Sequence, residues 1–122
     1  MPFYERKKYF YLFLLLLVTK CVEVLIMLEN RFKTKLIKEL EDMFPGCITL
    51  HLDPNEIQGI PDLLILFEDK WAVLEGKKNA NASVRPNQEY YVDLMDNMSF
   101  GRFIYPENKD EVLDELYLYF MN

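Results

Sequence analysis

Residues 59–77 read GIPDLLILFEDKWAVLEGK, and this stretch decides the fold. The continuous apolar run of residues 63–67 predicts a buried β-strand, and residues 71–75 predict a strand that returns beside it. The polar residues between the two runs predict a turn, with Glu68 and Asp69 as its two central residues. The stretch is therefore interpreted as a β-hairpin, although Glu-Asp is not the preferred sequence for a two-residue turn.

Two acidic residues flank this hairpin at positions that face each other. With a two-residue turn, Asp62 pairs with Glu75, and cross-strand neighbours have Cβ atoms about 5 Å apart; a longer turn makes the contact diagonal. Lys77 shares the face of Glu75 because side chains alternate along a strand. Two close carboxylates repel unless a cation or proton lies between them, and oxygen ligands suit Mg²⁺ or Mn²⁺. The spacing leaves two interpretations open, a catalytic metal site and a surface ion pair.

The rest of the chain alternates helices and strands. Its periodicity and turn residues predict these elements in order around the hairpin: helix 28–44, strand 47–52, helix 86–98, strand 101–105 and a last helix capped by Asn108 with Glu111. The order helix, three strands, helix, strand, helix predicts an α/β fold in which helices flank a mixed sheet.

Two polar residues on the predicted helices are directed toward the same site. Glu29 shares the inward stripe of the first helix, and a buried Glu is uncommon unless it is paired or binds a metal. The alternative is that Glu29 only occupies the first turn, near the positive end of the helix. Gln88 lies in the first turn of the second helix, where it can contact a phosphate or hold Glu75; the alternative is a simple cap. The apolar members of the first stripe are Phe32, Leu36, Leu40 and Met43.

The composition fits one folded domain. The chain has 122 residues, a net charge of −6 and 51% hydrophobic residues, which excludes a disordered chain. Cys21 and Cys47 form neither a disulfide framework nor a zinc motif, so a reducing, cytoplasmic setting is expected. The acidic balance argues against a protein that coats nucleic acid, but it leaves a local site open.

Residues 1–26 form a hydrophobic leader that differs from the body, residues 27–122. Basic residues 6–8 precede a wholly apolar run at 9–18. Three interpretations stay open: translation that starts at Met27, a signal or anchor segment, and an ordinary helix. Codons for residues 22–24 can contain a bacterial ribosome-binding sequence, which supports the first. The run is shorter than the ~20 residues that a membrane span needs, so no membrane partner is expected.

The motif residues 59–62 (GIPD) and 75–77 (EGK) resemble those of the PD-(D/E)XK nuclease superfamily. The closer similarity is to small phage and bacterial enzymes of the VRR-NUC and Holliday-junction-resolvase-like type. Their pattern is an early helical Glu, then G-x-P-D, E-x-K and a helix that begins near a Gln, and Glu29 and Gln88 supply the outer members. The resemblance covers about residues 27–120. It implies a restriction-endonuclease-like αβββαβ core followed by a C-terminal helix.

The resemblance also implies an activity, namely Mg²⁺-dependent phosphodiester hydrolysis. Asp62, Glu75 and the carbonyl of Gly76 would hold Mg²⁺ or Mn²⁺, and Glu29 would bind it directly or through water. Lys77 would orient the attacking water or stabilise developing charge, and Gln88 would position the substrate or a ligand. The implied nucleic-acid contacts are Lys78, Arg85 and Tyr91.

The implied substrate is DNA that is branched or has free ends, as in phage replication, recombination or repair. The implied location is the cytoplasm, which is the host cytoplasm for a phage protein. No organic cofactor is expected, and a two-fold symmetric junction would favour a homodimer. The alternative is a catalytically inactive nuclease-fold module that binds nucleic acid or a partner protein.

Overall fold

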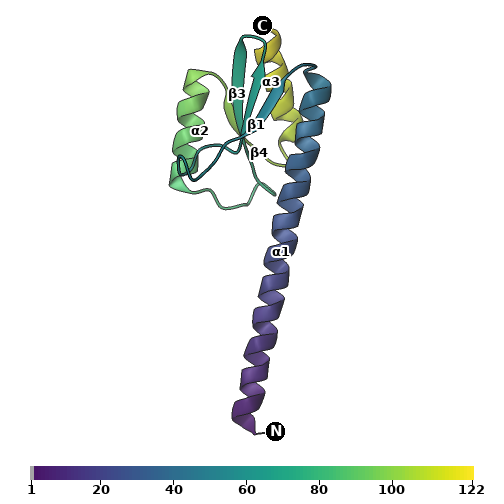
Figure 1. Ribbon diagram of the computed structural model, residues 1–122, viewed down its shortest axis with the longest axis vertical. Helices are drawn as coiled ribbons and strands as arrows, with labels where there is room; N and C mark the ends of the chain where they lie inside the picture. The colour runs from purple at the N-terminus through teal and green to yellow at the C-terminus, as the bar shows by residue number, and fades with distance from the viewer. Residues whose placement is uncertain (1) are drawn as a thin grey trace.

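The computed structural model describes residues 2–122, which form three helices and a four-stranded mixed sheet. Along the chain the elements are α1 (Phe3–Met43), β1 (Ile48–His51), β2 (Leu63–Phe67), β3 (Lys70–Gly76), α2 (Pro86–Met98), β4 (Gly101–Ile104) and α3 (Lys109–Met121). The strands lie in the order β1-β2-β3-β4, with β1, β2 and β3 antiparallel and β4 parallel to β3. Helix α2 lies on one side of the sheet, and α3 with the last turns of α1 lies on the other (Figure 1). The predicted α/β class is confirmed.

The hairpin of β2 and β3 has the register that the two-residue turn predicts. Leu63 pairs with Leu74 and Phe67 pairs with Lys70, which leaves Glu68 and Asp69 as the turn. Glu68 has φ of 54°, in the left-handed region that tight hairpin turns require. In this register Asp62, just before β2, and Glu75, near the end of β3, are neighbours across the hairpin.

The main core lies between the sheet and the pair α1 and α3. Leu36 and Leu40 of α1 are buried there, while Phe32 and Met43 are partly buried, so the predicted inward stripe is confirmed. Phe44 follows α1 and packs its ring against Phe67 and Phe120. The remaining buried members are Leu63, Ile65, Ala72, Leu74, Phe100, Ile104, Val112, Leu113 and Leu116. This core fixes the last turns of α1 against the ends of β2 and β3.

Several sequence predictions about element ends were wrong. The helix predicted over 28–44 runs over Phe3–Met43, and the strands predicted over 47–52 and 101–105 are limited to Ile48–His51 and Gly101–Ile104. The predicted capping box of α3 does not form. The Asn108 side chain instead bonds backward: its Oδ1 accepts from the Tyr105 N–H at 2.8 Å, and its Nδ2 donates to the Phe103 carbonyl at 3.0 Å. The Asn108 side chain therefore stabilises the turn before α3 and does not cap the N-terminus of the helix.

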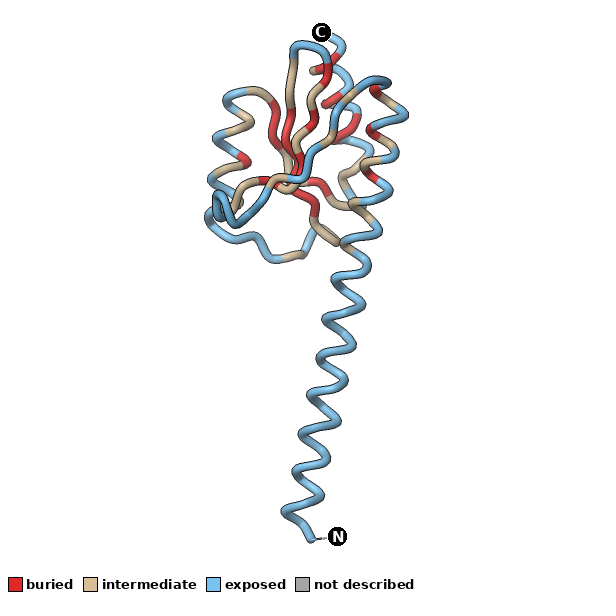
Figure 2. Tube along the Cα trace, viewed as in Figure 1, coloured by how far each residue is buried: buried red, intermediate tan, exposed pale blue. Residues whose placement is uncertain are grey.

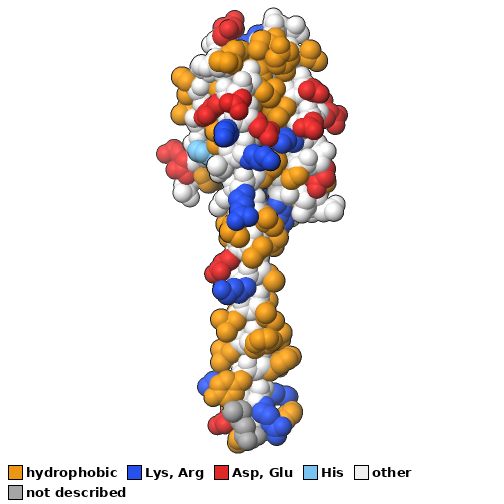
Figure 3. All heavy atoms as spheres, turned by 90° about the vertical axis from the view of Figure 1, so that its right-hand side faces the viewer, with side chains coloured by type: hydrophobic (Ala, Val, Ile, Leu, Met, Phe, Trp, Pro, Cys, Tyr) orange, Lys and Arg blue, Asp and Glu red, His pale blue; other side chains and the backbone are white. Residues whose placement is uncertain are grey.

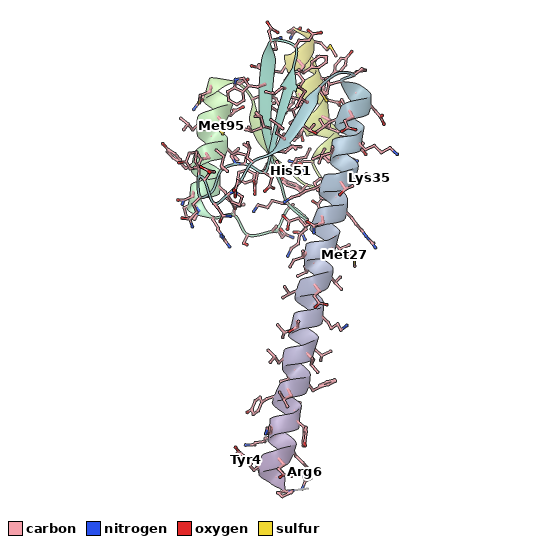
Figure 4. All side chains as sticks on the ribbon, in the orientation of Figure 1. Tyr4, Arg6, Met27, Lys35, His51 and Met95 are labelled. Atoms are coloured by element: carbon pink, nitrogen blue, oxygen red, sulfur yellow. The ribbon has the colours of Figure 1, made fainter. Side chains whose placement is uncertain are left out.

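The first part of α1 extends away from the body as an arm. Residues 2–28 are all exposed, and Met27 lies where the helix leaves the body (Figures 2 and 4). Figure 3 shows apolar side chains along this arm. Its most apolar 18-residue window has a mean hydropathy of 2.3, and α1 is the one helix in residues 2–122 that is long and apolar enough to cross a membrane. A helix that is apolar on all sides normally needs lipid or protein around it.

Candidate functional site

The site is built on two carboxylates at one end of the hairpin. Asp62 immediately precedes β2, and Glu75 lies next to the end of β3. Oε2 of Glu75 accepts a hydrogen bond from the Asp62 N–H at 2.9 Å, and Oδ2 of Asp62 accepts one from the Gly76 N–H at 3.2 Å. Each carboxylate is thus held by main-chain groups of the opposite strand. The predicted facing of Asp62 and Glu75 is confirmed.

A lysine and a glutamine complete the side of the site next to α2. Gln88, in the first turn of α2, donates from Nε2 to Oε1 of Glu75 at 2.9 Å. Its Oε1 accepts from Nζ of Lys77 at 2.9 Å and from the Arg85 N–H at 3.1 Å. Nζ of Lys77 also lies 3.7 Å from Oε1 of Glu75. Gln88 therefore both caps α2 and links the lysine to the buried carboxylate, so the two readings of Gln88 hold together.

The charge of Glu75 is poorly compensated. Glu75 is 3% exposed, and it is the single charged residue in the buried part of residues 2–122. Burial and, after it, the negative charge of Asp62 raise its pKa from 4.5 to about 7, although Lys77 and Lys33 oppose the rise. Buried carboxylates with a close like charge favour a bound cation or a proton. The pair is thus chemically poised to take up positive charge.

Lys33 of α1 supplies positive charge that the sequence analysis did not assign. Its Nζ lies 2.9 Å from Oδ2 of Asp62 and 3.3 Å from Oε1 of Glu29. Although burial opposes it, these two carboxylates raise the pKa of Lys33. Lys33 is four residues after Glu29 and shares its helix face, and this spacing was the signal that could have identified it. Glu29 therefore reaches the site through Lys33, and the structure gives it no direct contact with Asp62 or Glu75.

A small cavity opens beside the carboxylates on the side of α2. Its volume is about 110 Å³, and its walls include Asp62, Glu75, Gln88 and Arg85. Gly59 forms part of the wall at φ of 90°, where a Cβ atom would lie 2.5 Å from Cβ of Asn87. The loop before β2 therefore approaches the start of α2 closely because residue 59 has no side chain.

The other predicted DNA-contact residues lie outside this wall. Lys78 and Tyr91 are half-buried, and Tyr91 makes an edge-on contact with the ring of Tyr90 at 5.1 Å. Neither residue lines the cavity, whereas Arg85 does. The structure thus gathers Asp62, Glu75, Gly76, Lys77 and Gln88 and brings Glu29 close through Lys33. It gives Lys78 and Tyr91 no place in the wall of the cavity.

The carboxylates of the site are the side chains that would hold a divalent cation. Within residues 2–122, no three His, Cys, Asp or Glu side chains gather closely enough to hold a metal ion. Mg²⁺ in proteins commonly takes one or two carboxylates and keeps several waters. The facing pair Asp62 and Glu75 supplies that number of carboxylates. A third acidic ligand from Glu29 is not in place.

Comparisons of the chain with family models, curated proteins and solved structures found no significant match.

Proposed function

We propose that this protein is a metal-dependent nuclease that cleaves phosphodiester bonds in DNA in the cytoplasm. The observation that carries the proposal is the interlocked pair Asp62 and Glu75 with Lys77 and Gln88 bonded around Glu75. Glu75 is buried beside a second carboxylate and next to a cavity, and burying a charged group in this way is costly unless it serves a ligand. We further propose that α1 to β4 form a restriction-endonuclease-like core to which α3 is added.

Asp62, Glu75 and the carbonyl oxygen of Gly76 would hold Mg²⁺ or Mn²⁺. A bound divalent cation supplies polarisation of a phosphate and a lower pKa for a bound water. The pKa of Glu75 supports this assignment. Burial and the negative charge of Asp62 raise it to about 7, which means that both disfavour the ionised carboxylate. A cation beside the two carboxylates would offset both causes.

In this proposal Lys77 would act on the reacting groups. One of its three donors is used by Oε1 of Gln88, and the ammonium group stays 3.7 Å from Glu75. The remaining donors can orient a water or stabilise charge that develops on a phosphate. Gln88 is a positioning residue in this scheme, because its amide fixes Lys77 and Glu75 relative to each other.

DNA would approach from the side of α2. The cavity there reaches both carboxylates, and Arg85 at its wall is exposed. Arginine at such a position binds a phosphate without reading sequence. The net charge of −6 makes a broad electrostatic attraction to DNA unavailable, so binding depends on local contacts and on the shape of the DNA.

The test is a cleavage panel with the full chain in a mild detergent, on linear, nicked, flapped and four-way DNA. We expect cleavage of branched or end-containing DNA with Mg²⁺ or Mn²⁺ and none with EDTA. Asp62→Asn and Glu75→Gln should abolish cleavage, and the control Asp93→Asn, an exposed residue of α2, should retain it. Equal cleavage by all variants, or none by the wild type on any substrate, contradicts the proposal.

A second candidate function is a nuclease fold that binds DNA without cutting it. One observation favours it: Glu29 is paired with Lys33 and is not placed as a third acidic ligand. Wild-type protein that shifts the same DNA in a gel but leaves it intact with Mg²⁺ or Mn²⁺ would select this candidate.

A further inference from the structure

Lys33 occupies the side of the carboxylate pair that faces α1. Its ammonium lies 2.9 Å from Oδ2 of Asp62, and its side chain is 25% exposed, so solvent only partly screens the contact. Gly76 provides the space for it: a Cβ atom at residue 76 would lie 3.0 Å from Cε of Lys33. The Lys33 side chain therefore fits beside Asp62 because Gly76 of β3 has no side chain.

The ammonium group and a divalent cation would compete for the same carboxylate. Oδ2 of Asp62 already accepts from the Gly76 N–H and lies within ion-pair distance of Lys33. On this side the cavity next to Asp62 and Lys33 has a volume of only about 10 Å³, too small to add an ion and its waters while the lysine stays. Binding at Asp62 from this side therefore requires the lysine to move, whereas a cation in the cavity on the side of α2 competes with the lysine for the charge of the same carboxylate.

The carboxylate of Glu29 can pair with the ammonium group of Lys33 when the lysine leaves Asp62. Its Oε1 is 3.3 Å from Nζ of Lys33, and both residues lie on one face of α1, one turn apart. A rotation of the lysine side chain would exchange its contact with Asp62 for a closer one with Glu29. The positive charge then stays near the site, but it no longer occupies Asp62.

We propose that Lys33 is the counter-ion of Asp62 in the metal-free protein. When a divalent cation binds Asp62, the ammonium group of Lys33 leaves this carboxylate and pairs with Glu29. This inference rests on the proposed function, because it presumes a cation site at Asp62 and Glu75. It assigns Lys33 and Glu29 as positioning residues: Glu29 acts through the lysine and does not ligate the metal.

The experiment is a double-mutant cycle read by Mn²⁺ binding, measured by calorimetry on the full chain in detergent. Lys33→Met should bind Mn²⁺ about fivefold more tightly than wild type, because it removes one competing, partly screened ion pair. Glu29→Gln should bind about threefold more weakly, because the lysine loses its alternative partner. In the Lys33→Met background, Glu29→Gln should have no further effect. Lys35→Met, which changes an exposed lysine on the same helix (Figure 4), is the control.

The outcomes separate this inference from the proposed function. Mn²⁺ binding that is lost in Asp62→Asn and Glu75→Gln but is unchanged by Lys33→Met overturns the inference alone. A weakening by Glu29→Gln that persists in the Lys33→Met background also overturns it, since it would make Glu29 a ligand. Absence of Mn²⁺ binding by the wild type overturns both. Lys33→Gln, a second uncharged replacement, must match Lys33→Met for the inference to stand.

Discussion

Replacing Glu75 with glutamine should remove most of the pH dependence of this protein's stability between about pH 5 and about pH 8 in EDTA. In the folded protein the pKa of Glu75 is raised to about 7, whereas its ordinary value is 4.5. The unfolded chain therefore loses this proton at lower pH than the folded chain does. The stability that the protonated carboxyl contributes is complete below pH 4.5 and is lost as the pH rises through about 7.

The size of the effect follows from the difference between the two pKa values. One pKa unit corresponds to about 1.4 kcal/mol, so the free energy of unfolding should fall by at most about 3 kcal/mol across this range. The other shifted groups of residues 2–122, Lys33, Cys47 and Arg102, have pKa values raised above ordinary values of 9.0 or more, outside this range. Glu75→Gln should give a flat profile, whatever its absolute stability.

The assay is urea unfolding followed by the fluorescence of Trp71, the one tryptophan of the chain, which lies in β3 near the hairpin turn. The control Glu89→Gln changes an exposed carboxyl in the first turn of α2 and should keep the wild-type slope. Added Mg²⁺ should restore stability at about pH 8 in the wild type but not in Glu75→Gln. Parallel profiles for wild type and Glu75→Gln would refute the reasoning, because the burial of this charge would then cost nothing.

Three further predictions concern the rest of the site and the arm. Lys77→Met should lower the cleavage rate by about 100-fold while DNA affinity, measured by fluorescence anisotropy, changes little; an equal loss in both would remove its assigned role. Gly59→Ala should cost about 2 kcal/mol or more in urea unfolding, because φ is 90° and its Cβ would clash with Asn87, whereas Gly46→Ala, at φ of 87° in open space, should cost about 1 kcal/mol. Similar losses would show that the approach to Asn87 is not rigid. Deletion of residues 1–26 should leave the Trp71 transition unchanged and remove the need for detergent, because residues 2–28 are exposed and contain the wholly apolar run 9–18; a lower midpoint would mean that the arm stabilises the body.

The hairpin part of the site could be predicted because its contacts are local. Asp62 and Glu75 are 13 residues apart on adjacent antiparallel strands, and the turn length alone fixes which residues face each other. Gln88 was harder, because only the placement of α2 over β3 shows that its side chain reaches Glu75 as well as capping the helix. There its amide bonds both Glu75 and Lys77.

The amino-acid sequence by itself determined the α/β order of elements, the inward stripe of α1 and the facing of the two carboxylates, because periodicity and turn length act over short distances. Only the tertiary structure decided which side chain of α1 reaches Asp62. Glu29 and Lys33 share one helix face, and the choice between them depends on how Leu36 and Leu40 seat the helix against the sheet and on the space that Gly76 leaves. Packing at long range set that position, so the ammonium of Lys33 lies beside Asp62 where the helix pattern had directed the carboxylate of Glu29.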